Sequence, residues 1–592
     1  MATSSAAPVT YRIDASDVLA HLYRVTLTVE RPAKNQVFSL PVWIAGSYMV
    51  REFSKHLQNL RATQGTKPID VLQLDKHRWQ TTNTRVQPLV ISYEVYAFDN
   101  SVRTAWLGSR RGFFNPTSLC LRVLGQESRR HVLDISAINT IAACAISTGA
   151  TAKKVDKNGF GSYVFPHYDA LADCPFELGD FWRGSFTVRG VQHDFVVSGA
   201  LPSFDGARLL ADTQKIVEKE MDFWHGRTGK PPFSRYVFML NAVDDGYGGL
   251  EHANSTALIA KRRDLPRVGM GKANEGYITL LGLISHEYFH TWNVKRLRPA
   301  EFARYDYDSE QYTELLWFFE GFTSYYDDLL LRRAGLIDNA QYLKLLNKNI
   351  NQVMQTPGAQ LQSVAQASFD AWVKYYRQDE NTPNATVSYY TKGSLVALCL
   401  DLTLRSEGRT TLDAVMRGLW AHCKAGPMRE QDVASVLRKL GGRSFAAELA
   451  AWVHGTDFLP VQTLLERHGV QVVQDAPQWA QRLGLRVSLQ PGSVHIKTVL
   501  RNSIAEAAGM AAGDEWLAVD DWRLGKVDDL ALFLKPVKAG KGQRFQALVA
   551  RDQRLLRLPM TLPASTPAQE STWVLRSADA QRVGAWLEGL PC

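Results

Sequence analysis

Two histidines and a glutamate interrupt the largely apolar stretch LLGLISHEYFHTWNVKRL, residues 280–297. His286 and His290 are four residues apart, so on a helix they lie one turn apart on the same face and reach one metal ion. Zinc takes nitrogen and oxygen ligands, and a catalytic zinc keeps one position for water. Glu287, about 100° further round the helix, faces that water as a general base. The pattern predicts a catalytic metal site; the alternative is a core helix with two incidental histidines.

A third ligand is needed, and Glu320 in the stretch LLWFFEGFTSYY is the strongest candidate. We expect it within an apolar helix, where an unpaired carboxylate is costly and a bound metal removes that cost; a structural ion pair is the alternative. Gly321 follows directly and permits close contact between helices. Glu310 and Glu314 belong to a more polar first turn, where carboxylates interact favourably with the helix dipole. The predicted ligands of one Zn²⁺ per chain are His286, His290 and Glu320.

A glycine-rich segment, YGGLEHANST at 247–256, offers groups that would make a zinc peptidase an aminopeptidase. An exopeptidase needs an anionic group that fixes the free ammonium of the substrate beside the metal. Glu251 can pair with that ammonium, and Gly248 and Gly249 let a peptide backbone approach closely. The alternative is a plain turn followed by a solvated glutamate.

The surrounding elements predict an α+β chain of several domains. Residues 1–195 alternate apolar and polar side chains in short runs between turn residues, which indicates an antiparallel β domain. Residues 196–475 carry the site, with a helix from about 209, a strand before the glycine-rich segment, and mostly helices beyond about 277. Short strands return in residues 476–564, and residues 565–592 are expected to be a C-terminal tail.

Composition excludes some classes of function. The chain has 592 residues, of which 45% are hydrophobic, and its 68 basic residues are interspersed with 59 acidic ones. The short basic runs lack the interleaved aromatic residues of a nucleic-acid surface, so we expect no nucleic-acid partner. No run of 18 apolar residues is present, so we expect no membrane partner. Six scattered cysteines and no visible signal peptide indicate a cytoplasmic protein, or a periplasmic one if a leader is missing from this sequence.

Three longer strings carry a family resemblance. An HExxH motif followed downstream by EGF resembles the gluzincins, zinc peptidases with two histidines and a glutamate as ligands. The strings HEYFHTWNVKRLRP, PVWIAGSYMVREF near residue 41 and YDALADCPFELGDF near residue 168 resemble the glycyl aminopeptidase family over most of residues 10–560. The resemblance implies a thermolysin-like, mostly helical catalytic domain and a preference for N-terminal glycine or alanine.

Two further roles rest on similarity to the aminopeptidase N family. There a glycine-rich segment ending in methionine, glutamate and asparagine binds the substrate amine; here Glu251 keeps the glutamate, while His252 departs from the pattern and its role stays open. The string SYYTKGSLVAL resembles the segment with the catalytic tyrosine. Tyr390 is therefore the expected oxyanion donor, and Tyr389, one residue away, remains the alternative.

The C-terminal region resembles a bacterial PDZ domain. LGLRV at 483–487 and SIAEAAGMAAGDEWLAVDDWRL at 503–524 carry the likeness. Such domains capture extended peptides by strand addition, with backbone amides near the LGL loop receiving a terminal carboxylate. A purely structural lid or spacer is the alternative to a C-terminal peptide ligand.

Together these features predict a zinc aminopeptidase that acts on peptides with a free N-terminus. The first alternative is a zinc endopeptidase, in which Glu251 is incidental. The second is a catalytically silent scaffold in which the PDZ domain provides the function.

Overall fold

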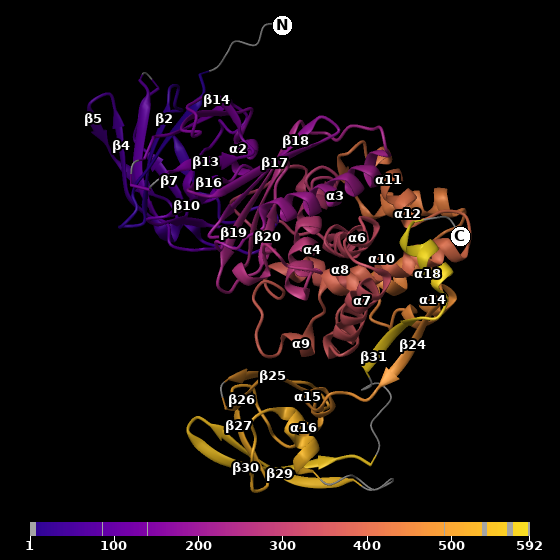
Figure 1. Ribbon diagram of the computed structural model, residues 1–592. Helices are drawn as coiled ribbons and strands as arrows, with labels where there is room; N and C mark the ends of the chain where they lie inside the picture. The colour runs from indigo at the N-terminus through magenta and orange to yellow at the C-terminus, as the bar shows by residue number, and fades with distance from the viewer. Residues whose placement is uncertain are drawn as a thin grey trace. The chain divides into compact units, whose positions relative to one another are not determined.

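The structure is a computed structural model that describes residues 7–85, 87–138, 140–141, 143–490, 492–534, 542–564 and 572–589 (Figure 1). Its chain forms two compact units. The first contains Met1–Tyr312, Arg333–Leu336 and Cys423–Met428. The second contains Thr313–Arg332, Ile337–His422 and Arg429–Cys592.

An extended β-sheet begins the first unit. Along its strand β1, Tyr11 and Ile13 are buried and Arg12 between them is exposed, the period of two expected where one face of a sheet packs on a core. The strands in order across the sheet are β14 (Thr151–Val155), β15 (Gly161–Phe165), β12 (His131–Ile135), β1 (Val9–Asp17), β2 (Leu22–Val29), β8 (Leu89–Tyr96), β4 (Leu57–Gln64) and β5 (Lys67–Ile69).

One pair in this sheet departs from the antiparallel arrangement expected from the sequence. Strands β1 and β12 are parallel, with Val9 opposite His131, whereas β1 and β2 are antiparallel. A parallel pair needs a long connection instead of a hairpin, and most of the N-terminal region lies between these two strands. The short alternating runs of the sequence predict strands, but they carry no information about such a distant partner.

Two smaller sheets and the short α-helices α1 and α2 also belong to the described part of the N-terminal β-rich region. One sheet has the order β13 (Ala145–Thr148), β16 (Phe176–Gly179), β10 (Arg111–Phe114) and β9 (Ala105–Leu107). The other has the order β11 (Arg122–Val123), β3 (Val37–Ser39), β7 (Arg78–Thr81) and β6 (Val71–Gln73). The helices are α1 (Pro116–Leu119) and α2 (Tyr168–Ala172).

A mixed sheet in the same unit supports the candidate site. Its strands in order are β17 (Trp182–Val188), β18 (Val191–Ser198), β19 (Arg235–Val243), β21 (Ser255–Lys261) and β20 (Gly248–Glu251). Strand β19 runs parallel to both of its neighbours and is buried along nearly its whole length, as expected for a strand covered on both faces. The expected domain boundary at 195 falls within β18, which pairs with β19.

Helices α3 (Gly206–His225) and α4 (Glu275–Phe289) pack against each other, and α4 also contacts β20 and β21. Each helix begins at a side-chain cap: Asp205 accepts from the backbone N–H of Arg208, and Asn274 accepts from that of Tyr277. Most of α4 is buried, which is why its sequence is apolar on all sides. Short strands β22 (Arg298–Pro299) and β23 (Pro427–Met428) also belong to this unit.

The second unit is largely helical, and its long helix α10 is buried along most of its length. Helix α10 contacts α5, α7, α8, α11 and α14. The helices are α5 (Leu316–Phe319), α6 (Gly321–Arg333), α7 (Asn339–Met354), α8 (Val364–Phe369), α9 (Thr382–Ala385), α10 (Tyr389–Ser406), α11 (Leu412–His422), α12 (Glu430–Gly441), α13 (Ala446–Leu449) and α14 (Val461–Arg467).

A separate antiparallel sheet with its own hydrophobic core follows in this unit. Its strands are β25 (Leu485–Gln490), β26 (Ser493–Val499), β27 (Glu515–Val519), β29 (Gln543–Arg551) and β30 (Arg554–Leu562), with β28 (Trp522–Arg523) beside β27. Its helices are α15 (Trp479–Leu483), α16 (Ile504–Ala507) and α17 (Leu530–Phe533).

The segment expected to be a tail contains regular structure where it is described. Strand β31 (Thr572–Ser577) pairs with β24 (Val470–Asp475), and α18 (Ala580–Leu587) follows it (Figure 1). Both β31 and α18 contact α7. Residues 572–587 thus pack against the helical region.

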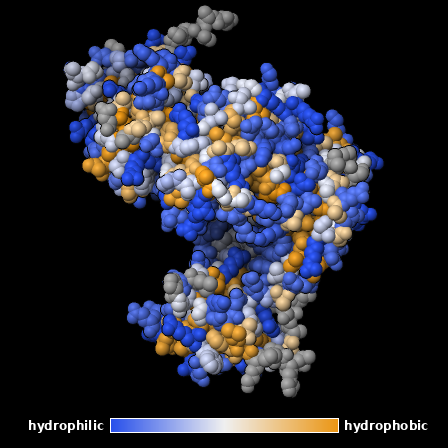
Figure 2. All heavy atoms as spheres, in the orientation of Figure 1, coloured by the Kyte–Doolittle hydropathy of each residue, from blue (hydrophilic) through white to orange (hydrophobic). Residues whose placement is uncertain are grey.

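The predicted combination of a β-rich N-terminal region with a helical region further along the chain is confirmed. Figure 2 shows hydrophilic and hydrophobic residues intermixed over the visible face, in keeping with the interspersed charges of the sequence.

Candidate active site

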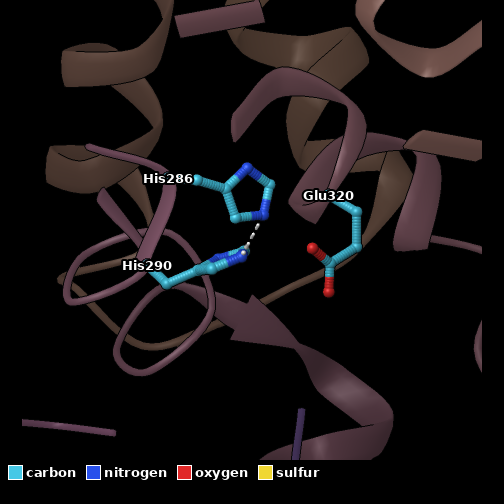
Figure 3. Close-up of side chains that lie close together, drawn as sticks. All are labelled: His286, His290 and Glu320. Carbon is cyan, nitrogen blue, oxygen red and sulfur yellow. Dashed lines mark hydrogen bonds between the residues drawn. The ribbon is translucent and has the colours of Figure 1, made fainter. Parts of the chain in front are cut away.

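The HExxH motif lies at the end of helix α4. His286 and Glu287 belong to its last turn, and His290 is the C-terminal cap residue. The four-residue spacing brings the two imidazoles together, with their Nε2 atoms 3.1 Å apart (Figure 3). The Nδ1 atom of His290 lies 2.8 Å from the carbonyl oxygen of Asn293 and donates to it, so Nε2 is the ring nitrogen suited to bind a metal. His290 is thereby oriented as a metal ligand.

Glu320 completes a cluster of possible metal ligands with the two histidines. One donor atom from each of His286, His290 and Glu320 lies within 4.8 Å of the others, and Figure 3 shows the Glu320 carboxylate directed toward both rings. Glu320 is only 2% exposed. Glu310 and Glu314, which the sequence does not favour as metal ligands, are exposed.

A pair of glycines places Glu320 near helix α10. Glu320 stands between α5 and α6 and is the cap residue of α5. A Cβ atom on Gly321 would lie 2.6 Å from the backbone of Gly393 in α10, and one on Gly393 would lie 2.6 Å from the carbonyl oxygen of Trp317. Only glycine permits this approach of two helix backbones. The close contact that Gly321 was expected to permit is therefore present.

Tyr390 and Tyr389 lie in the first turn of α10. Burial raises the pKa of Tyr390 well above its usual value, and the nearby Glu320 carboxylate adds to this rise. The Tyr390 ring stacks on that of Tyr375, with centroids 5.3 Å apart, and its hydroxyl lies 3.5 Å from that of Tyr376. Because the Glu320 carboxylate raises the pKa of Tyr390, the Tyr390 hydroxyl lies near a predicted metal ligand.

Glu287 lies directly against strand β20. A Cβ atom on Gly249 would stand 2.0 Å from an oxygen of the Glu287 carboxylate, so a larger residue here would displace that carboxylate. Glu287 is 5% exposed. Within the described residues, β20 is the last strand of its sheet and pairs only with β21. An extended peptide could therefore add along its open edge, beside the candidate base.

Glu251, at the end of the same strand, meets a loop of the N-terminal region. Gly46 has a φ of 94°, and a Cβ atom there would lie 2.5 Å from both carboxylate oxygens of Glu251. Gly46 belongs to a tight turn in which the N–H of Ser47 donates to the carbonyl of Ile44. No local pattern in the sequence predicts a role for this glycine, although it stands in one of the strings that carry the family resemblance.

His252, whose role the sequence left open, is buried in a charged cluster. Its Nδ1 atom lies 3.3 Å from Oδ1 of Asp173, which also receives the ammonium of Lys295 at 2.6 Å. The second oxygen of Asp173 accepts the backbone N–H of Ala253 at 2.8 Å. Burial alone would raise the pKa of Asp173, but the Lys295 ammonium and the hydrogen bond from His252 lower it below its usual range. The cluster anchors the turn that follows Glu251.

Two regions of the chain match models of one peptidase family. Residues 10–180 match the peptidase M61 N-terminal domain, and residues 279–396 match the M61 glycyl aminopeptidase model. The second region contains the whole predicted ligand set and Tyr390. The class of the protein is therefore a peptidase of the aminopeptidase type.

A crystal structure of an aminopeptidase N family protein from Idiomarina loihiensis matches with a TM-score of 0.93 and 36% sequence identity. The match covers 98% of this chain and 100% of that protein. The chain therefore belongs to the glycyl aminopeptidase family, M61.

An M1 zinc metallopeptidase from Deinococcus radiodurans is a more distant match, with 14% identity, 77% of this chain and 94% of that chain covered, and a TM-score of 0.47. No significant match was found among curated proteins. In the described part of the chain, no helix is long and apolar enough to cross a membrane.

Proposed function

We propose that the chain is a zinc-dependent aminopeptidase that hydrolyses the N-terminal peptide bond of peptides. The observation that carries this proposal is the convergence of His286, His290 and Glu320, whose donor atoms lie within 4.8 Å of one another. Membership of the M61 family supports the peptidase activity.

The donor set fits one zinc ion. Two imidazoles and one carboxylate are a ligand set of catalytic zinc sites, which leave a fourth position for water. The Nε2 atoms of His286 and His290 are 3.1 Å apart. Two ligands about 2.0 Å from a tetrahedral zinc would be separated by about 3.3 Å. When bound, zinc supplies Lewis acidity to the scissile carbonyl and to the attacking water.

The other residues of the site have separate roles in the proposed hydrolysis. Glu287 removes a proton from the attacking water and delivers it to the leaving amine. Glu251 pairs with the substrate ammonium, while Gly248 and Gly249 admit the substrate backbone along strand β20. The Tyr390 hydroxyl donates a hydrogen bond to the oxyanion. Its raised pKa means that the hydroxyl keeps its proton at neutral pH.

We further propose a preference for N-terminal glycine or alanine. The support is the description of the matched family as glycyl aminopeptidases. The values of kcat/KM for anilides of glycine, alanine, leucine and phenylalanine would measure it. Equal kcat/KM for all four would contradict the preference without contradicting peptidase activity.

The decisive experiment compares one peptide with its N-acetylated form. The purified enzyme should hydrolyse the free peptide and leave the acetylated one intact, because acetylation removes the ammonium that Glu251 binds. Glu251→Ala should raise KM for the free peptide. Equal hydrolysis of both forms would establish the alternative, a zinc endopeptidase. A metal-loaded protein that cleaves neither would favour the silent scaffold.

We propose that residues 476–564 form a PDZ-like domain that captures a peptide C-terminus. Gly484, with a φ of 73°, precedes β25, which is an edge strand among the described residues. Such an edge accepts an added strand. Titrating the full-length protein with labelled peptides that end in a carboxylate or an amide tests this role. Binding of neither peptide would favour a structural spacer.

We also propose domain boundaries from the strand pairing. The N-terminal β-rich domain ends near 180, because β17 and β18 join the sheet of β19. The catalytic domain then extends to about 475, the PDZ-like domain follows, and the described part of 565–592 belongs with the helical region through β31. Limited proteolysis should cut near these boundaries.

A further inference from the structure

Arg103, which the sequence did not single out, extends from the N-terminal region to strand β20. It stands between β8 and β9, and its backbone N–H donates to the Ser101 hydroxyl. Its Nη2 atom donates to the carbonyl oxygen of Gly249 at 3.3 Å. A Cβ atom on Gly248 would lie 3.7 Å from Nη1 and 3.9 Å from Nη2. The guanidinium therefore lies beside the two glycines to which the proposed function assigns the substrate backbone.

The guanidinium of Arg103 has no anionic partner among the described residues. Its Nε atom is buried and makes no hydrogen bond within the part of the chain that the structure describes. Arg111 in the same region is different, because its Nε and Nη2 atoms donate to the two oxygens of Glu177 at 2.7 and 2.8 Å. A partly buried cation is stabilised by an anion, so Arg103 offers an unfilled site for one.

The spacing along β20 defines the length of the ligand. Gly249 and Glu251 are two residues apart, a separation of about 7 Å along an extended strand. A dipeptide also spans at most about 7 Å. When the ammonium of a dipeptide pairs with Glu251, its carboxylate therefore comes to the level of Arg103. The Glu287 carboxylate also lies against Gly249, next to the position of such a dipeptide.

We propose that Arg103 binds the C-terminal carboxylate of short peptide substrates, with dipeptides preferred. This inference rests on the proposed function, because it uses Glu251 as the amine site. A guanidinium binds a carboxylate through two parallel hydrogen bonds, which gives both affinity and orientation. Arg103 thus selects substrates by charge at the end opposite the ammonium, and the enzyme is specialised for the last step of peptide breakdown.

The test compares Gly-Ala with Gly-Ala amide, which differ only in the terminal charge. The wild-type enzyme should hydrolyse the free acid with a kcat/KM higher by about tenfold or more, the contribution of hydrogen bonds between charged groups. Arg103→Gln should reduce this ratio to about one, and Arg103→Lys should retain part of it. Arg110→Gln, a neighbouring exposed arginine, is the matched control and should keep the wild-type ratio.

Two results would overturn the proposal. One is a wild-type ratio near one; the other is a loss in Arg103→Gln that is equal for acid and amide, which would indicate a purely structural bond to Gly249. Thermal melts of each variant identify a folding defect, and the ratio within one preparation is independent of the active fraction. Glu251→Ala, measured in parallel, should lower kcat/KM by the same factor for the acid and the amide. If kcat/KM falls for neither substrate, Glu251 is not the amine site. The acid-to-amide ratio still shows whether Arg103 binds the carboxylate.

Discussion

Glu287 and Glu251 are both almost fully buried carboxylates, with exposed fractions of 5% and 4%. Each lies against a glycine: Gly249 for Glu287 and Gly46 for Glu251. Side chains at these two positions would fill the space that the carboxylates occupy. The glycines therefore leave room for the two buried acids, which the proposed mechanism uses as the base (Glu287) and as the amine site (Glu251).

Glu287→Gln separates catalysis from metal binding. The glutamine is nearly the same size but cannot accept a proton, so kcat should fall by about 10²–10⁴-fold. Zinc content should stay at one per chain, because the predicted ligands are untouched. Steady-state kinetics and elemental analysis on the same preparation measure both. Glu275→Gln, an exposed residue of the same helix, is the control, and normal turnover in Glu287→Gln would refute the proposed base.

Tyr390→Phe tests the oxyanion donor against its neighbour. Removing a single hydrogen-bond donor to an oxyanion typically lowers kcat by about 10²–10³-fold. We expect this loss in Tyr390→Phe, because its hydroxyl is influenced by Glu320. Tyr389→Phe should keep kcat within a few-fold. The opposite result in the two variants would assign the role to Tyr389.

At the scale of elements, the turn between β20 and β21 is held from two directions. Asp173 accepts the N–H of Ala253, while Arg296, just beyond the HExxH helix, donates to the carbonyl of Ala253 at 3.0 Å. Arg296 also donates to the carbonyl of Thr291 at 2.7 Å. The strand with the candidate amine site is thereby joined to the chain that follows the histidines. Its position relative to helix α4 depends on these buried polar contacts.

Asp173→Asn should destabilise the first unit. The substitution leaves the buried Lys295 ammonium without its counter-ion, at a cost of about 2–4 kcal/mol at pH 7. The cost reflects a lowered pKa for Asp173 and a raised one for Lys295, where the attraction of Asp173 outweighs the opposing effect of burial. Thermal denaturation of wild type and variant measures it. Asp245→Asn, which breaks the exposed pair with Lys261, should leave the melting temperature unchanged.

The pH dependence of the Asp173–Lys295 pair follows from the directions of the two pKa shifts. The contribution of Asp173 is complete above about pH 4, the unfolded value, and is lost as pH falls through its lower folded pKa. The contribution of Lys295 is complete below about pH 10 and is lost as pH rises through its higher folded pKa. The stability difference between wild type and Asp173→Asn should therefore be constant between these limits and shrink in acid. A difference that grows below pH 4 would contradict this assignment.

The proposed site residues that the sequence alone suggests are those that neighbours on the same element define. His286, Glu287 and His290 follow from the spacing of a single helix, and Glu320 follows from its apolar context. Gly46 and Arg103 could not be found in this way, because each meets strand β20 across a long stretch of chain. Their significance depends on a fold that brings the N-terminal region to the glycine-rich strand.

At the scale of the whole molecule, alternation and helical periodicity predicted the kinds of elements but not their distant partners. The parallel pair β1–β12 and the pair β24–β31 join segments separated by about a hundred residues. Pairing at such separations depends on the loops that are closed between the strands, which a local pattern does not encode. For this reason the sequence alone predicts a tail after residue 564.

Trp586 provides the test of that C-terminal segment. It is fully buried, its Nε1 atom lies 3.3 Å from the Tyr325 hydroxyl, and its ring meets that of Tyr342. Trp586→Ala should therefore lower the free energy of unfolding of the helical region by about 3–5 kcal/mol. Trp522→Ala is the matched control, because that tryptophan is 61% exposed, and it should change stability by at most about 1 kcal/mol. Urea denaturation followed by circular dichroism distinguishes them; equal midpoints would show that the end of the chain is a tail after all.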